Sequence, residues 1–249
     1  ADAVELAIGE HAQQPRLGVG WHIADLVEKQ GAAIGLFEAA AALLLGAGGM
    51  HVYDERVLQA LRRLTRDAGI HLIADEVLTG LGRTAKMWGV EHYGVVPDIL
   101  VAGKNMSGGV EPCAGVAARD DILGDNPRAT AGSTFAGTPA GCAACLKTLE
   151  IYERDNILEH AAKLAEIAAR RMAPWESRYG IVSQVRALGL LMGVSFAGES
   201  KPDEEFFTAR SVRHEMLRRG VWAICDNQAQ VRMYPALNMP PETLLEGLA

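Results

Sequence analysis

Two short apolar runs, each ending at a polar residue, constrain the fold of this 249-residue chain more than any other feature of its sequence. The first run, "HLIAD", ends at Asp75, and the second, "ILVAGK", ends at Lys104. Apolar runs of this length that are bounded by glycine or polar residues are typical of buried strands. The runs alternate with segments of helical periodicity. That order indicates an α/β fold whose mostly parallel sheet is covered by helices on both faces.

Periodicity also places elements along most of the remaining chain. Helices are expected at 21–31, 53–69, 138–155, 156–180, 203–220 and 240–249, with Pro139 in a first turn and Asn156 as a cap. Short strands are expected at 115–119, on both sides of Gly189, at 221–225 and at 230–234. The pattern beyond residue 180 is α+β. We therefore predict a large domain at 1–165 and a smaller C-terminal domain at 166–249.

The composition argues against several classes of partner. The chain has 24 Lys and Arg against 31 Asp and Glu, a net charge of -7, so a basic surface for nucleic acid is not expected. The longest apolar tract, residues 39–50, is rich in glycine and shorter than the roughly 20 residues that span a bilayer. The first ten residues contain acidic side chains and no basic start of a signal peptide. We expect neither nucleic-acid nor membrane binding, and a cytoplasmic location.

The four cysteines fit the same compartment. Cys142 and Cys145 form a C-x-x-C motif, but no second pair and no histidine at zinc-ligand spacing accompany it. The motif lies in an alanine-rich helical pattern. We interpret both residues as small core side chains and expect no metal site.

Three polar residues are expected near one edge of the predicted sheet. Asp75 and Lys104 end strands, and Thr134 lies in the small-residue loop that precedes the helix at 138–155. In open α/β sheets, ligands bind beyond the carboxyl ends of the strands. An amine, a carboxylate and a hydroxyl in one crevice suit pyridoxal phosphate chemistry, in which a lysine forms a Schiff base. A lysine amine has an unperturbed pKa of roughly 10.4, so we expect Lys104 to be buried, which would lower that pKa.

The stretch around these residues resembles the class III, or omega-type, aminotransferases of pyridoxal phosphate fold type I. The similarity runs from "LIADEV" through "TGLGRT" and "EHYGVVPD" to "ILVAGKNMSGG", with 29 positions between Asp75 and Lys104. "STFAGTPAGCAACLKTLE" and "QVRMYPAL" are similar to two further elements of the family. The elements occur in the family's order between residues 46 and 249. The resemblance implies a large fold type I domain, mostly parallel sheet covered by helices, followed by a smaller α+β domain.

The resemblance also assigns roles around the cofactor. Lys104 would form the Schiff base with pyridoxal 5'-phosphate, Asp75 would bind the pyridine nitrogen, and Val77 would pack against the ring. Ser133 and Thr134 would bind the phosphate.

Partners and substrates are implied in the same way. Thr134 would reach the cofactor of the neighbouring subunit, so a homodimer is implied. Arg232 would bind the carboxylate of a small-molecule amino donor or oxo-acid acceptor. The implied activity is transfer of an amino group from an amine or amino acid to a 2-oxo acid.

The chain departs from the family pattern at several positions. Leu78 replaces the usual Gln or Met, Ala85 replaces a common glycine, and Thr138 replaces the Asn before Pro139. The family's phosphate loop and ring-stacking aromatic residue are not recognisable before residue 46. We therefore expect a partial chain.

Three alternatives stay open from the sequence. The first is a non-catalytic homologue or fragment that folds and dimerises without turnover. The second is another reaction of the same family, such as decarboxylation, racemisation or mutase chemistry. The third is a dinucleotide-binding oxidoreductase, suggested by "LLLGAGGMH", although His51 stands where the third glycine should fall.

Overall fold

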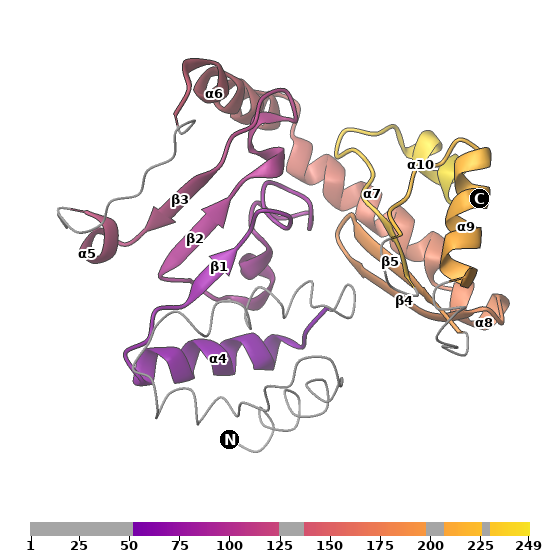
Figure 1. Ribbon diagram of the computed structural model, residues 1–249, viewed down its shortest axis with the longest axis horizontal. Coiled ribbons are helices and arrows are strands. Elements are labelled where there is room, and N and C mark those ends of the chain that lie inside the picture. The colour runs from indigo at the N-terminus through magenta and orange to yellow at the C-terminus, as the bar shows by residue number, and fades with distance from the viewer. Residues whose placement is uncertain (1–51, 125–136, 198–206, 226–229) are drawn as a thin grey trace.

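The computed structural model of the chain describes residues 52–124, 137–197, 207–225 and 230–249. Within these residues the strands form two three-stranded sheets, ordered β1-β2-β3 and β4-β5-β6 (Figure 1). The helix expected at 21–31 lies outside the described residues. None of the helices in the described part is long and apolar enough to cross a membrane.

The first sheet has one parallel and one antiparallel pair. β1 (Ile73–Asp75) runs parallel to β2 (Ile99–Ala102), and β3 (Gly115–Ala118) pairs with β2 in the antiparallel sense. The sheet is therefore mixed, and β3 is its antiparallel strand. The β2–β3 connection contains only the short 3-10 helix η2 (Lys104–Ser107), whereas a parallel crossover usually needs a full helix.

Helix α4 (Glu55–Asp67) forms at the position the periodicity predicted and packs against η1 and the residues just before β1 and β2. It begins at Asp54, whose side chain accepts a hydrogen bond from the Arg56 backbone N–H at 2.9 Å, as N-cap residues do. Its Leu61 joins a small apolar cluster of buried residues that also contains Leu72, Tyr93 and Val95. The 3-10 helix η1 (Gly89–Tyr93) supplies the tyrosine.

Asp98, just before β2, ties α4 and the end of β3 to the sheet. Its carboxylate accepts hydrogen bonds from Arg62 Nη1 at 2.5 Å, Arg119 Nη1 at 2.5 Å and the Leu72 backbone N–H at 2.8 Å. Burial alone would raise the pKa of Asp98, but the hydrogen bonds from Arg62 and Leu72 and the charges of both arginines lower it overall. A charged carboxylate therefore fixes this corner of the fold. The one-turn helix α5 (Asp120–Leu123) follows it.

Two long helices follow the second gap. α6 (Pro139–Arg154) has Pro139 in its first turn and Thr138 as N-cap, with the Thr138 hydroxyl accepting from the Gly141 N–H. α7 (Ile157–Met172) begins after Asn156, which is in the left-handed region at φ 50° and makes no side-chain capping bond. The expected helix at 156–180 is interrupted near Pro174, since proline cannot donate a helical hydrogen bond. The short α8 (Trp175–Arg178) continues from there.

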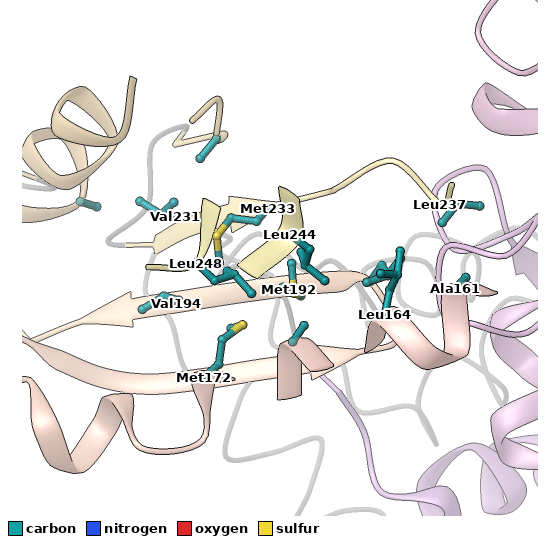
Figure 2. Packing of buried hydrophobic residues seen from close by; sticks show 14 of the residues in the cluster. Ala161, Leu164, Met172, Met192, Val194, Val231, Met233, Leu237, Leu244 and Leu248 are labelled. Carbon is teal, nitrogen blue, oxygen red and sulfur yellow. The ribbon is translucent and has the colours of Figure 1, made fainter. Parts of the chain in front are cut away.

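The second sheet carries the larger apolar core. β4 (Val182–Leu188) and β5 (Leu191–Phe196) form a hairpin around Gly189, and β6 (Gln230–Met233) pairs with β5 on the other side. Side chains from α7, the strands and α10 (Pro241–Gly247) gather in one cluster, drawn in Figure 2. α9 (Phe207–Arg218) completes this half.

Two sequence expectations in this half need comment. Residues 221–225 do not form a full strand, because only Ile224 makes a bridge, to Arg232. The predicted domain boundary at 165/166 would fall inside α7, which runs from the first sheet toward the second (Figure 1). That boundary stays a prediction.

Candidate active site

Asp75 and Lys104 lie at the same end of the parallel strand pair. Asp75 is in register with Val101 of β2, and the Glu76 N–H donates to the Val101 carbonyl at 2.8 Å. Lys104 follows Val101 by three residues and opens η2. The two side chains therefore come from neighbouring strand ends, as expected for a ligand site of an α/β sheet.

Val77 belongs to the same small region. Its N–H donates to Asp75 Oδ1 at 3.0 Å. Its side chain also packs on Gly103, the residue before Lys104, where an added Cβ would stand 3.4 Å from Val77 Cγ1. The sequence-predicted residues Asp75, Val77 and Lys104 thus meet around one strand edge.

The expected burial of Lys104 is wrong, because both Lys104 and Asp75 are exposed. The chain turns out of β2 at Gly103, and Lys104 takes a left-handed conformation, with φ 43°. A non-glycine residue in this region costs roughly 1–2 kcal/mol, and such strain is common at functional sites.

Glu76 is a buried residue that the sequence reasoning did not single out. It is 1% exposed, and its carboxylate accepts hydrogen bonds from the Thr79 hydroxyl and from the N–H groups of Gly89 and Val90, both at 2.8 Å. Side chains alternate across a strand, so a residue next to an outward Asp75 points inward. That alternation is the signal that could have identified Glu76. Its carboxylate fixes the loop between β1 and η1.

This loop also contacts the second sheet. Arg83 Nη1 donates to the Pro235 carbonyl at 2.5 Å, and the Arg83 carbonyl accepts from the Leu190 N–H at 3.0 Å. Gly189 lies so close that an added Cβ would stand 2.1 Å from the Thr84 carbonyl carbon. Burial lowers the pKa of Arg83, although the nearby tyrosines Tyr152 and Tyr234 oppose this. The loop thus joins the two halves.

Of the remaining predicted site residues, Arg232 lies on β6, opposite Gly193, and is half-buried. It exchanges backbone hydrogen bonds with Ile224 at 2.8 and 2.9 Å. Its strand leads directly to Pro235, the partner of Arg83. Ser133 and Thr134 lie outside the described residues. Of the two motif cysteines, Cys145 is buried as expected, whereas Cys142 is exposed.

The side chains at this edge fit a pyridoxal ring. The Lys104 ammonium and Asp75 Oδ2 make no hydrogen bond with the described residues, so both are available to a ligand. An amine can condense with an aldehyde, a carboxylate can pair with a pyridinium N–H, and Val77 offers an apolar contact to the ring. The groups present therefore match the groups that the cofactor carries.

Comparisons with known proteins point in the same direction. The family model described as Aminotransferase class-III matches residues 25–249. An acetylornithine aminotransferase of Methanocaldococcus jannaschii is 33% identical over 201 residues, 79% of this chain and 47% of the relative. A leucine/methionine racemase of Thermococcus litoralis is 32% identical over 204 residues, 82% of this chain and 46% of the relative.

Solved structures give the same result. The crystal structure of acetylornithine aminotransferase from Elizabethkingia anophelis has a TM-score of 0.74 and 30% identity, covering 82% of this chain and 50% of that one. This similarity shows that the fold is the fold type I arrangement. The chain spans about half the length of the relatives it matches.

Proposed function

Because the chain belongs to the class III aminotransferase family, we propose that the protein is a pyridoxal-phosphate-dependent aminotransferase. It moves an amino group from an amine or amino acid to a 2-oxo acid. The observation that carries this proposal is the meeting of Asp75, Val77 and Lys104 at the ends of β1 and β2. Bound pyridoxal phosphate supplies an aldehyde that condenses with amines and a ring that accepts electron density.

Each residue has a defined task in this proposal. The Lys104 amine would hold the cofactor by its aldehyde, and the free amine would act as the base that accepts a proton from the substrate carbon and as the acid that gives it back. The Asp75 carboxylate pairs with the ring nitrogen and favours its protonated form. Val77 supports the ring. The open edge at Lys104 gives its amine room to move between these positions.

The substrate and phosphate contacts extend the proposal. Arg232 binds a substrate carboxylate, a task that suits the planar fork of guanidinium donors. Ser133 and Thr134 bind the cofactor phosphate, with Thr134 acting on the neighbouring subunit of a homodimer. The location is cytoplasmic, which the net charge and the four described free cysteines support.

The test is covalent attachment of the cofactor. The protein is mixed with pyridoxal phosphate, its visible absorbance is recorded, and the link is reduced with borohydride and mapped by peptide mass. Attachment at Lys104 that is lost in Lys104→Ala and kept in Lys163→Ala, an exposed lysine on α7, supports the proposal. No attachment in the unmutated protein would favour the non-catalytic alternative.

Racemisation is a second candidate, because the Thermococcus litoralis racemase is about as similar to this chain as the aminotransferase above. The same amine can return its proton to either face of the substrate carbon. Incubation of the loaded protein with single enantiomers, with and without 2-oxo acids, separates the two. Loss of optical rotation without an oxo acid indicates a racemase, whereas amino transfer that requires the oxo acid indicates an aminotransferase.

A further inference from the structure

Three groups that are distant in sequence converge directly behind Lys104. The Asn105 side-chain amide donates to the Leu81 carbonyl at 2.9 Å and to the Tyr152 hydroxyl at 2.7 Å. The Tyr152 hydroxyl in turn donates to the same Leu81 carbonyl at 2.6 Å. The three groups come from η2, from α6 and from the loop after β1.

We call the Asn105 amide, the Tyr152 hydroxyl and the Leu81 carbonyl the triangle, and its hydrogens are equal in number to the lone pairs that accept them. An amide nitrogen has two hydrogens, and each has one acceptor here. The tyrosine hydroxyl accepts one bond and donates one, and a carbonyl oxygen has two lone pairs for two donors. Because each bond polarises the next, a closed set of this kind is more rigid than three separate bonds.

Two residues of the triangle region have a strained backbone conformation. Lys104 has φ 43° and Leu81 has φ 51°, both in the left-handed region, which non-glycine residues rarely adopt. Tyr152 also packs its ring on the neighbouring Gly82, where an added Cβ would stand 3.4 Å from Tyr152 Cε1. A strained conformation persists only where its surroundings over-determine it, and these contacts do so.

We propose that Asn105 and Tyr152 are positioning residues for Lys104, which fix the left-handed turn that aims its amine at the cofactor. The proposal rests on the proposed function and deepens it. Lys104 makes no side-chain hydrogen bond with the described residues, so its backbone conformation alone sets the direction in which its Cα–Cβ bond leaves the chain. Asn105 is the next residue, and its amide ties that backbone to α6 and to the loop after β1.

The state of Tyr152 agrees with this role. Burial raises the pKa of Tyr152, while the charge of Arg83 and the hydrogen bond from Asn105 lower it only in part. The phenol therefore stays protonated at neutral pH and keeps its hydrogen for the Leu81 carbonyl. Phenylalanine at this position would keep the ring packing on Gly82 and remove only the two bonds of the hydroxyl.

The test measures how fast the cofactor becomes attached to Lys104. Tyr152→Phe, Asn105→Ala and the isosteric Asn105→Asp are loaded with pyridoxal phosphate, trapped with borohydride at timed intervals and quantified by peptide mass. Each variant should lower the attachment rate about three- to ten-fold, the effect of losing a neutral hydrogen bond. The double variant Tyr152→Phe with Asn105→Ala should lower it by less than the product of the single effects, because both residues act through one carbonyl.

Matched controls separate positioning from general stability. Tyr179→Phe and Asn238→Ala change exposed residues that make none of the three hydrogen bonds, and both variants should attach cofactor at the unmutated rate. Thermal unfolding is recorded for every variant. If Tyr152→Phe and both Asn105 variants attach cofactor at the unmutated rate, whatever their thermal stability, the positioning role is wrong. The proposed function is not affected by that result. If borohydride fixes no cofactor at Lys104 in the unmutated protein, the proposed function fails and the positioning role fails with it.

Discussion

The two halves of the molecule are held together by different forces. Around β1 and β2 the buried set includes polar side chains, Glu76, Thr79, Thr84, Asp98 and Ser107, beside a small apolar cluster of four residues. Around β4, β5 and β6 the core is one apolar cluster of sixteen buried residues, and β5 is buried on both faces. Hydrogen bonds are directional and apolar contacts are not. The half with directional contacts is the half that carries the candidate site.

Because of that difference, we expect some mutations to change stability without changing cofactor chemistry, and others to do the reverse. Apolar burial contributes to the free energy of unfolding in proportion to area and tolerates small shifts. A set of hydrogen bonds fixes atoms to within a few tenths of an ångström, which a lysine that must meet a cofactor requires. Truncations in the apolar core of the second half should therefore change stability alone, whereas changes at the strand ends that carry Asp75 and Lys104 should change cofactor chemistry.

The largest expected effect is that of Lys104→Ala. Activity should fall by roughly 10²–10⁴-fold, because the variant lacks the amine that moves the proton. The free energy of unfolding should change by less than about 0.5 kcal/mol, as for other exposed residues. Steady-state kinetics and chemical denaturation measure the two quantities. A large loss of stability would contradict the separation of site and core.

Leu164→Ala makes the opposite change. Leu164 is fully buried on α7 in the second core, so its truncation should cost about 3 kcal/mol of stability. Urea denaturation measures this. In the folded protein, cofactor attachment at Lys104 should keep its unmutated rate, and slower attachment would show that the two halves are coupled.

Glu76→Gln tests the polar half. The carboxylate accepts from two backbone N–H groups, and a glutamine amide turned toward either one would place two donors face to face. We expect a loss of about 1–3 kcal/mol, the cost of leaving buried groups unpaired. Glu91→Gln, at an exposed position on η1, is the control. An equal loss of stability in that variant would contradict the prediction that the buried Glu76 carboxylate stabilises the fold more than an exposed one.

Acid should weaken the corner at Asp98. The folded-state pKa of Asp98 is below its usual value, so its contribution is present above the unfolded pKa of roughly 3.9 and is lost as pH falls through the folded pKa. Stability measured from pH 6 down to pH 3 should therefore fall, and Asp98→Asn should flatten that fall. An Asp67→Asn control removes an exposed carboxylate at the end of α4, outside the Asp98 cluster. The same slope in all three proteins would contradict the assignment.

The sequence was sufficient for the local elements and for the strand-end residues. Helix α4 follows its apolar spacing, and Asp75 and Lys104 end strands because polar residues stop an apolar run. It was insufficient where a contact joins distant segments. The bond from Arg83 to Pro235 spans 152 residues, and nothing in either local pattern indicates the other. The antiparallel direction of β3 and the missing side-chain cap at Asn156 were not predicted for the same reason. Tertiary packing overrides local preference at both places.

Ala85 gives the smallest expected effect and sharpens the comparison within the polar half. The sequence marks Ala85 as a departure from a common glycine, and its φ of 65° gives the physical reason for that glycine. Ala85→Gly should remove left-handed strain of roughly 1–2 kcal/mol, offset by the greater freedom of glycine in the unfolded chain, for a net gain below about 1 kcal/mol. Ala173→Gly, at the helical end of α7, should instead destabilise. Thermal unfolding of the two variants should give shifts of opposite sign, and a loss in Ala85→Gly would mean that the loop depends on the alanine methyl group.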